Sequence, residues 1–327
     1  MLAAVERITG SCGPLDLSIS AADGELAAVA CNYVSLFSRT WRERTRRVEV
    51  HLERRALGVR ASGTFVSCAH MTVDRTGDSY VADTQYGFVA RGSTVAGTDV
   101  WTISVPPETV FDEPQVGDME DVFSLICTAG WRNEGFVALH AGAVVKGDVC
   151  ALLCAASGGG KSTLTTALVL NGWSTLGDDK LLLRNEGGKP VLRSLLQTFN
   201  LDPATGRWFD LRDLASLPRY SAWTDKRRVH LDRVRPGAAR PHARPTHIVE
   251  VARTAAHAGI RSAPMTVSQS AAALLRQIVL PCDAPVARWT LTQTMAALRG
   301  MRGVRLEIGQ DAYRSSGWLA GIEDALR

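Results

Sequence analysis

Residues 139–183 read LHAGAVVKGDVCALLCAASGGGKSTLTTALVLNGWSTLGDDKLLL, and this stretch decides the fold. An apolar run, Val149–Cys154, leads into a glycine-rich turn, and Lys161 opens a segment with apolar residues at helical spacing. A short second strand then delivers Asp178 and Asp179. This order predicts an α/β domain in which both motifs meet at the carboxyl ends of the strands.

The turn after the first strand is suited to hold phosphate groups. Gly158–Gly160 lack Cβ atoms, so the backbone can aim its N–H groups at phosphate oxygens, and the following helix adds unpaired N–H groups. In such a loop Lys161 reaches the β- and γ-phosphates, and the Ser162 hydroxyl ligates Mg²⁺. The predicted nucleotide-binding residues of the loop are Ser157, Gly158, Gly159, Gly160, Lys161, Ser162 and Thr163. Ala155 stands where GxxxxGK[ST] has its first glycine, and a positive φ there would cost about 1–2 kcal/mol.

The two aspartates follow the loop lysine at a short distance along the chain. Asp178 lies 17 residues after Lys161, which fits one strand–helix–strand unit and is short for a motor or transporter ATPase. Two adjacent carboxylates can divide labour, one accepting a hydroxyl proton and the other holding metal. The alternative is a turn or a helix cap. With the loop, the pair predicts phosphoryl transfer from ATP with Mg²⁺ to a hydroxyl.

The motifs resemble the catalytic domain of the HPr serine kinase/phosphorylase family and its broad group of HPr-kinase-like proteins. The resemblance covers residues 119–327 and is strong over 139–184. It implies a P-loop fold related to phosphoenolpyruvate carboxykinase, with ATP and Mg²⁺ as cofactors and a hydroxyl-bearing acceptor. The matching motifs are Leu139-His140, SGGGKST, LGDD, VRPG at 234–237 and IVEVA at 248–252.

The same resemblance implies roles for individual residues. Asp178 is similar to the family's catalytic base, and Asp179 to an acid of the metal site, where Ser162 would be the other ligand. His140 is similar to a residue that orients the base or contacts phosphate. The catalytic residues expected on this basis are Asp178, Lys161 and His140.

Residues 219–244 are rich in arginine and proline. The resemblance makes Arg235 a contact to the transferring phosphoryl group, although Arg227 or Arg228 could fill the same role. One interpretation is a lid that closes on the triphosphate and acceptor and neutralises charge in the transition state. The other is a solvated loop.

Two departures from the family leave the acceptor open. Residues 192–213 contain no clear counterpart of a glycine-rich stretch with a metal-binding glutamate, and AARPHARPTH lengthens the gap before IVEVA. The acceptor could be a serine of a protein or peptide, or a small-molecule alcohol. A nucleotide-binding regulator without turnover is the alternative, favoured by Ala155 and the missing glutamate. Lyase chemistry would need metal-binding Lys and His residues that we do not find.

The chain is predicted to form two domains. Residues 1–115 suggest a smaller accessory α+β domain, with a helix over 25–41 and strands at 48–57, 64–73, 79–90 and 101–105. Residues 119–327 form the catalytic domain, which is expected to start with a helix over 119–131 and a strand over 136–145.

Composition sets further bounds. Of 327 residues, 46% are apolar and 21% charged, as in ordinary soluble proteins. No apolar run is long enough to span a membrane, and the seven cysteines show no CxxC pattern, so we expect a cytoplasmic protein without a membrane partner. A net charge of +4 is too small to indicate nucleic acid as a partner, and self-association is left open.

Overall fold

The computed structural model describes residues 6–37, 41, 44–56, 65–68, 71–196, 198–209, 211, 213–221, 224–278, 284–309 and 311–327. Contacts divide the chain into two compact units. The first comprises residues 1–136 with 221–223 and 280–288, and the second comprises 137–220, 224–279 and 289–327. Within the described ranges, no helix combines the length and the apolar character that crossing a membrane requires.

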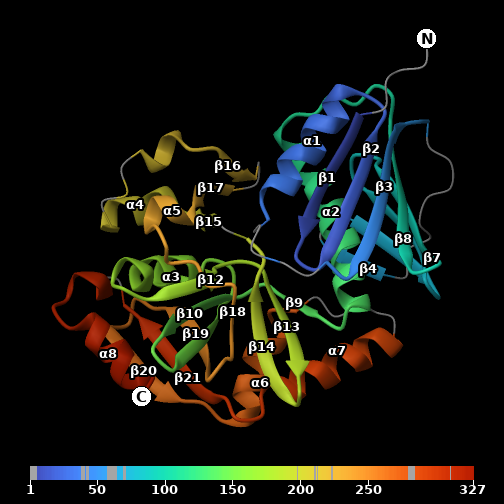
Figure 1. Ribbon diagram of the computed structural model, residues 1–327. Helices are drawn as coiled ribbons and strands as arrows, with labels where there is room; N and C mark the ends of the chain where they lie inside the picture. The colour runs from blue at the N-terminus through green and yellow to red at the C-terminus, as the bar shows by residue number, and fades with distance from the viewer. Residues whose placement is uncertain are drawn as a thin grey trace. The chain divides into compact units, whose positions relative to one another are not determined.

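The first unit contains an eight-stranded sheet and two helices, α1 (Gly24–Ser35) and α2 (Glu113–Asn133) (Figure 1). Its strands are β1 (Glu6–Cys12), β2 (Leu15–Ala21), β3 (Arg46–Arg54), β4 (Phe65–Cys68), β5 (Met71–Thr76), β6 (Ser79–Thr84), β7 (Val89–Val95) and β8 (Thr98–Val105). They lie in the order β1-β2-β3-β8-β7-β6-β5-β4, with β2, β3 and β8 parallel. The predicted strand over 79–90 is two strands, because a turn at Gly87 with φ of 80° separates β6 from β7.

Helix α2 belongs to the first unit, which corrects the predicted domain boundary. The prediction began the catalytic domain at residue 119, but the units divide after Phe136. The Trp131 indole donates a hydrogen bond to the Cys12 carbonyl at 2.9 Å, and Gly130 gives the Leu15 side chain room to approach the helix. The helix is therefore anchored to β1 and β2 by buried contacts that its sequence pattern alone does not specify.

The second unit is a mixed α/β structure with several sheets. The main sheet has the order β12-β10-β11-β19-β21-β20, in which β11, β19 and β21 are parallel and the other neighbours antiparallel. Its strands are β10 (Gly142–Lys146), β11 (Val149–Cys154), β12 (Ser174–Gly177), β19 (His247–Arg253), β20 (Ile260–Pro264) and β21 (Arg302–Ile308). The predicted strand over 149–154 is confirmed.

Two smaller sheets complete this unit. One has the order β18-β14-β13-β9 and the other β15-β17-β16. Their strands are β9 (Val137–Leu139), β13 (Leu181–Glu186), β14 (Lys189–Ser194), β15 (Thr198–Leu201), β16 (Arg219–Ser221), β17 (Thr224–His230) and β18 (His242–Ala243). The helices are α3 (Lys161–Leu170), α4 (Pro203–Phe209), α5 (Leu231–Val234), α6 (Val267–Leu275) and α8 (Trp318–Ala325), with short 3₁₀ turns η1 (Leu214–Ser216) and η2 (Ala312–Arg314). A further helix, α7 (Ala284–Ala297), begins within residues assigned to the first unit and continues into the second.

Alternate residues of β11 face opposite sides of the main sheet. Cys150, Leu152 and Cys154 belong to one core, whereas Ala151 and Leu153 belong to the other. All five are at most 2% exposed. Because both faces of the strand are covered, its sequence is a continuous apolar run rather than an alternating one.

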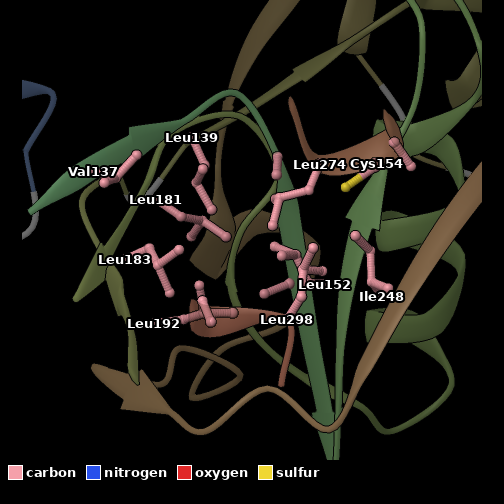
Figure 2. Close-up of a cluster of buried hydrophobic side chains, with 14 of the residues drawn as sticks. Val137, Leu139, Leu152, Cys154, Leu181, Leu183, Leu192, Ile248, Leu274 and Leu298 are labelled. Carbon is pink, nitrogen blue, oxygen red and sulfur yellow. The ribbon is translucent and has the colours of Figure 1, made fainter. Parts of the chain in front are cut away.

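In the first of these cores, side chains of β9, β13 and β14 pack against one face of the main sheet. In the second, side chains of α3 and α8 pack against the opposite face. Figure 2 shows the first core, where side chains of the small sheet are directed toward those of the main sheet. From the small sheet come Val137, Leu139, Leu181, Leu183 and Leu192, and they meet Leu152 and Ile248 of the main sheet.

Two predicted segments differ from the structure. The predicted strand over 136–145 is interrupted at His140, which lies between β9 and β10. The described part of residues 219–244 is not a wholly solvated loop: it contains β16, β17, α5 and β18, with Val229, Leu231 and Val234 in a buried cluster. Hydrophobic anchors between the arginines hold this segment within the second unit.

Candidate functional site

The glycine-rich loop, residues 155–160, joins β11 to α3. Gly158 and Gly160 have φ of 75° and 96°, which only glycine adopts without strain. A Cβ on Gly159 would lie 3.0 Å from the Ala156 carbonyl oxygen, so the loop is tightly closed. Ala155 is absent from the described non-glycine residues with positive φ, which means that the departure from glycine there causes no strain.

Lys161 connects this loop to the aspartate pair. Its ammonium group donates a short hydrogen bond to the main-chain carbonyl of Asp178. Gly142 of β10 lets the Asp178 backbone lie close to that strand, because a Cβ there would lie 3.3 Å from the Asp178 Cα. Gly177, with φ of 134°, turns the chain directly before the pair. The structure therefore brings the predicted loop lysine and the predicted base to one place.

Asp178 is fully buried, and neither carboxylate oxygen has a hydrogen-bond partner among the described residues. Burial raises its pKa to about 6, and the negative charge of Asp179 adds to this, while the Lys161 ammonium and the nearby Ser162 and Asn200 lower it. A carboxylate is suited to accept a proton when its pKa is close to neutral and its two oxygens have no hydrogen-bond partner.

Asp179 has a different environment from its neighbour. Its Oδ1 lies 3.1 Å from His140 Nε2, and its Oδ2 accepts a hydrogen bond from the Asn200 amide at 3.1 Å. Burial raises its pKa, but surrounding positive charges outweigh burial and hold the pKa below its usual value. These charges belong to His140, Lys161, Lys180 and Lys226.

His140 lies at the break between β9 and β10, and its backbone N–H donates to the Gln277 carbonyl at 2.8 Å. Partial desolvation and the charges of the three lysines lower its pKa, whereas Asp179 raises it. The side chain is 71% exposed, so solvent weakens each of these effects. The structure pairs this predicted catalytic residue with Asp179 rather than with Asp178.

The oxygen donors present suit Mg²⁺. Ser162 lies close enough to Asp178 to lower its pKa, and hydroxyl and carboxylate oxygens are the ligands that Mg²⁺ prefers. No group of three or more His, Cys, Asp or Glu side chains that could hold a metal occurs among the described residues, so water and phosphate oxygens would complete the shell. Since both oxygens of Asp179 are already paired, Asp178 is as good a candidate ligand as the predicted Asp179.

Arg235 does not lie at the loop, which contradicts its predicted role. Its guanidinium donates to the carbonyls of Val169 and Trp173, at 3.3 and 3.2 Å, beyond the carboxyl end of α3. The ten-residue helix separates it from the glycine-rich loop by about 15 Å. The alternatives Arg227 and Arg228 donate to carbonyls of Leu217 and Tyr220.

Sequence reasoning missed Asn200 and Arg253. Asn200 lies on β15 and fixes one oxygen of Asp179. Arg253 ends β19, and its Cγ would lie 3.1 Å from a Cβ on Gly160. The sequence does contain a signal for Arg253, because this residue directly follows the apolar IVEVA strand. The carboxyl ends of parallel strands meet at one edge of a sheet, so Arg253 could have been predicted to lie near the loop after β11. Nothing in the local pattern distinguishes Asn200.

Comparisons with known proteins give distant structural relations. No protein-family model matches the chain, and no curated protein matches it in sequence. Among solved structures, the chain is similar to the HPr(Ser) kinase/phosphatase from Coxiella burnetii, with a TM-score of 0.31 and 10% identity over 58% of this chain and 93% of that one. The likeness is distant, so function is argued from the site itself.

Proposed function

We propose that the protein is an ATP- and Mg²⁺-dependent kinase that transfers the γ-phosphoryl group to a hydroxyl acceptor. The observation that carries this proposal is the contact between Lys161 and the Asp178 carbonyl, next to a buried carboxylate with no partner. It joins a phosphate-binding element to a proton acceptor in one place.

In this mechanism the loop N–H groups and Lys161 bind the triphosphate. Asp178 takes the proton from the acceptor hydroxyl as its oxygen forms a bond to the γ-phosphorus. The bond from the γ-phosphorus to the β–γ bridging oxygen breaks, and ADP leaves. Mg²⁺, when bound through Ser162 and a carboxylate of the pair, supplies neutralisation of phosphate charge. Arg253 adds positive charge beside Gly160.

Asp179 and His140 are assigned a supporting role. The contact with His140 at 3.1 Å and the Asn200 hydrogen bond fix the Asp179 carboxylate in one orientation. A fixed negative charge next to Asp178 contributes to the raised pKa of the proposed base. Asp179 remains the predicted ligand of Mg²⁺, with Asp178 as the competing ligand.

The acceptor is proposed only by chemical class. A serine of a protein or peptide and a small-molecule alcohol both offer the hydroxyl that the mechanism needs. The loop conformation removes one of the two arguments for a regulator without turnover, because Ala155 needs no positive φ.

The test is ADP formation and an 80 Da gain in mass on panels of serine-containing peptides, free serine and other alcohols, at fixed MgATP. Wild type should phosphorylate a member of one panel, and Asp178→Asn should bind ATP with similar affinity without turnover. If both proteins bind ATP equally and neither turns over with any acceptor, the kinase proposal fails.

A further inference from the structure

Three aromatic side chains surround Tyr313 in the second unit and form a cluster of four with it. Their ring centroids lie 5.3–5.5 Å from that of Tyr313, in edge-to-face arrangements. The four side chains are contributed by α4, η2 and α8 and are Trp208, Phe209, Tyr313 and Trp318. Trp208 is 37% exposed, which is high for the largest apolar side chain in a packed cluster.

Two independent contacts place this cluster beside the glycine-rich loop. Thr205, one helical turn before Trp208 on α4, has its hydroxyl 3.3 Å from that of Thr163 in the first turn of α3. On the other side, Arg253 lies against Gly160, and its positive charge acts on the Tyr313 phenol. The topology agrees with these contacts. Strands β11, β19 and β21 are parallel, so the loop after β11 and Tyr313, shortly after β21, both lie at the carboxyl edge of the main sheet.

Polar groups at this cluster lack partners. The Tyr313 hydroxyl is buried and makes no hydrogen bond with the part of the chain that the structure describes. In the same part of the chain, the exposed Arg253 side chain makes no hydrogen bond or ion pair. A buried phenol without a hydrogen-bond partner is unusual in a cluster that serves packing alone, and this one lies next to the partly exposed Trp208 indole.

These observations fit a flat, partly polar ligand. An indole face stacks on a nucleobase, a phenol hydroxyl bonds to a base or ribose, and a guanidinium attracts phosphate. We propose that the Trp208–Tyr313 cluster binds the nucleoside end of the nucleotide whose phosphates occupy the glycine-rich loop, with Arg253 between the two. This inference rests on the proposed function, because it requires the loop to hold the triphosphate.

The test compares two ligands with Mg²⁺, ATP and inorganic tripolyphosphate, by calorimetry. Tripolyphosphate has the phosphates but no nucleoside, so it reports on the loop alone. Trp208→Ala should weaken ATP binding roughly 5- to 150-fold, the range for loss of one base–aromatic stack, and leave tripolyphosphate binding unchanged. Trp208→Phe should retain most of the affinity for ATP. Met295→Ala, which alters a side chain of similar exposure at 41%, should change neither affinity.

Tyr313→Phe provides a second variant that keeps the ring packing. It removes a buried hydroxyl without a partner, so the folded state should not be weakened, and ATP binding should fall severalfold with tripolyphosphate binding intact. If Trp208→Ala and Tyr313→Phe leave ATP binding unchanged, or weaken both ligands equally, the inference is wrong.

Lys161→Ala separates this result from a failure of the kinase proposal. It should weaken the binding of both ligands. If it weakens both while Trp208→Ala weakens neither, only the nucleoside inference fails. If it weakens neither, the loop does not bind phosphate, and the proposed function fails with the inference.

Discussion

The loop-and-aspartate stretch, residues 139–184, and the arginine-rich stretch, residues 219–244, are both rich in charged side chains, but the structure uses them differently. In the first, Lys161, Asp178 and Asp179 are buried close together, and neither Asp178 carboxylate oxygen has a hydrogen-bond partner among the described residues. In the second, Arg227, Arg228 and Arg235 donate to main-chain carbonyls of their own unit. A buried carboxylate without a partner costs stability and marks a candidate functional group, whereas an arginine that donates to carbonyls stabilises the fold.

The largest effect is expected at Lys161. Lys161→Met removes the charge that would bind the β- and γ-phosphates, so phosphoryl transfer should fall on the order of 10³-fold or more. Turnover of MgATP with an identified acceptor measures this effect, and far-UV circular dichroism checks the fold. A loss below about tenfold would contradict the division between the two stretches.

Asp178→Asn should reduce turnover to a similar degree and at the same time stabilise the protein. Its pKa of about 6 in the folded state lies above the usual value of 3.8 for an aspartate, so the folded state binds more protons than the unfolded state between these pH values. Stability contributed by the protonated form is present below pH 4 and is lost as the pH rises through about 6. The asparagine variant lacks this loss and should be more stable at pH 7 by on the order of 3 kcal/mol.

Urea unfolding from pH 4 to 8, without nucleotide or Mg²⁺, measures that difference. Turnover of the wild type should rise with pH through about 6, as the proposed base loses its proton. Equal unfolding free energies for the two proteins at both pH 4 and pH 8 would show that the Asp178 carboxylate is not strained by burial.

Asp179→Asn should have the opposite effect on stability, although it lies one residue away. The pKa of Asp179 is held low by His140 and the lysines, so its contribution is present above the unfolded pKa and is lost as the pH falls through the folded pKa. Replacement should lower the unfolding free energy at pH 7 by about 1.5–3 kcal/mol, the range for hydrogen bonds to a charged group. The same urea series checks this, and a stability gain would contradict the paired environment.

Much of the first stretch could be predicted from sequence because its constraints are local. Glycines at positions of positive φ, the continuous apolar run of β11 and the helix beginning at Lys161 each follow from neighbouring residues. The environments of the two aspartates could not be predicted, since they depend on Asn200 and Lys226 from distant strands. For the same reason, a run of arginines gave no indication that Arg235 would meet α3.

Lys226 belongs to the arginine-rich stretch, but its charge acts on His140 and Asp179 of the candidate site. It therefore tests whether the two stretches are functionally separate. It lowers the pKa of both His140 and Asp179, so Lys226→Met should raise the pKa of the His140 imidazole. An NMR titration, with His140→Gln to assign the resonance, measures this shift. An unchanged His140 pKa in Lys226→Met would mean that solvent screens the Lys226 charge and that Lys226 has no effect on the candidate site.

The smallest effect on activity is expected at Arg235. Arg235→Leu removes a guanidinium that donates to the Val169 and Trp173 carbonyls, so the unfolding free energy should fall by about 1–3 kcal/mol, the cost of leaving such groups unpaired. Arg240→Leu, an exposed arginine of the same segment, is the matched control and should change stability by less than about 0.5 kcal/mol. Neither variant should change the KM for MgATP, because α3 separates Arg235 from the loop. A KM that rises tenfold in Arg235→Leu alone would place this arginine in the phosphate site and remove the distinction between the two stretches.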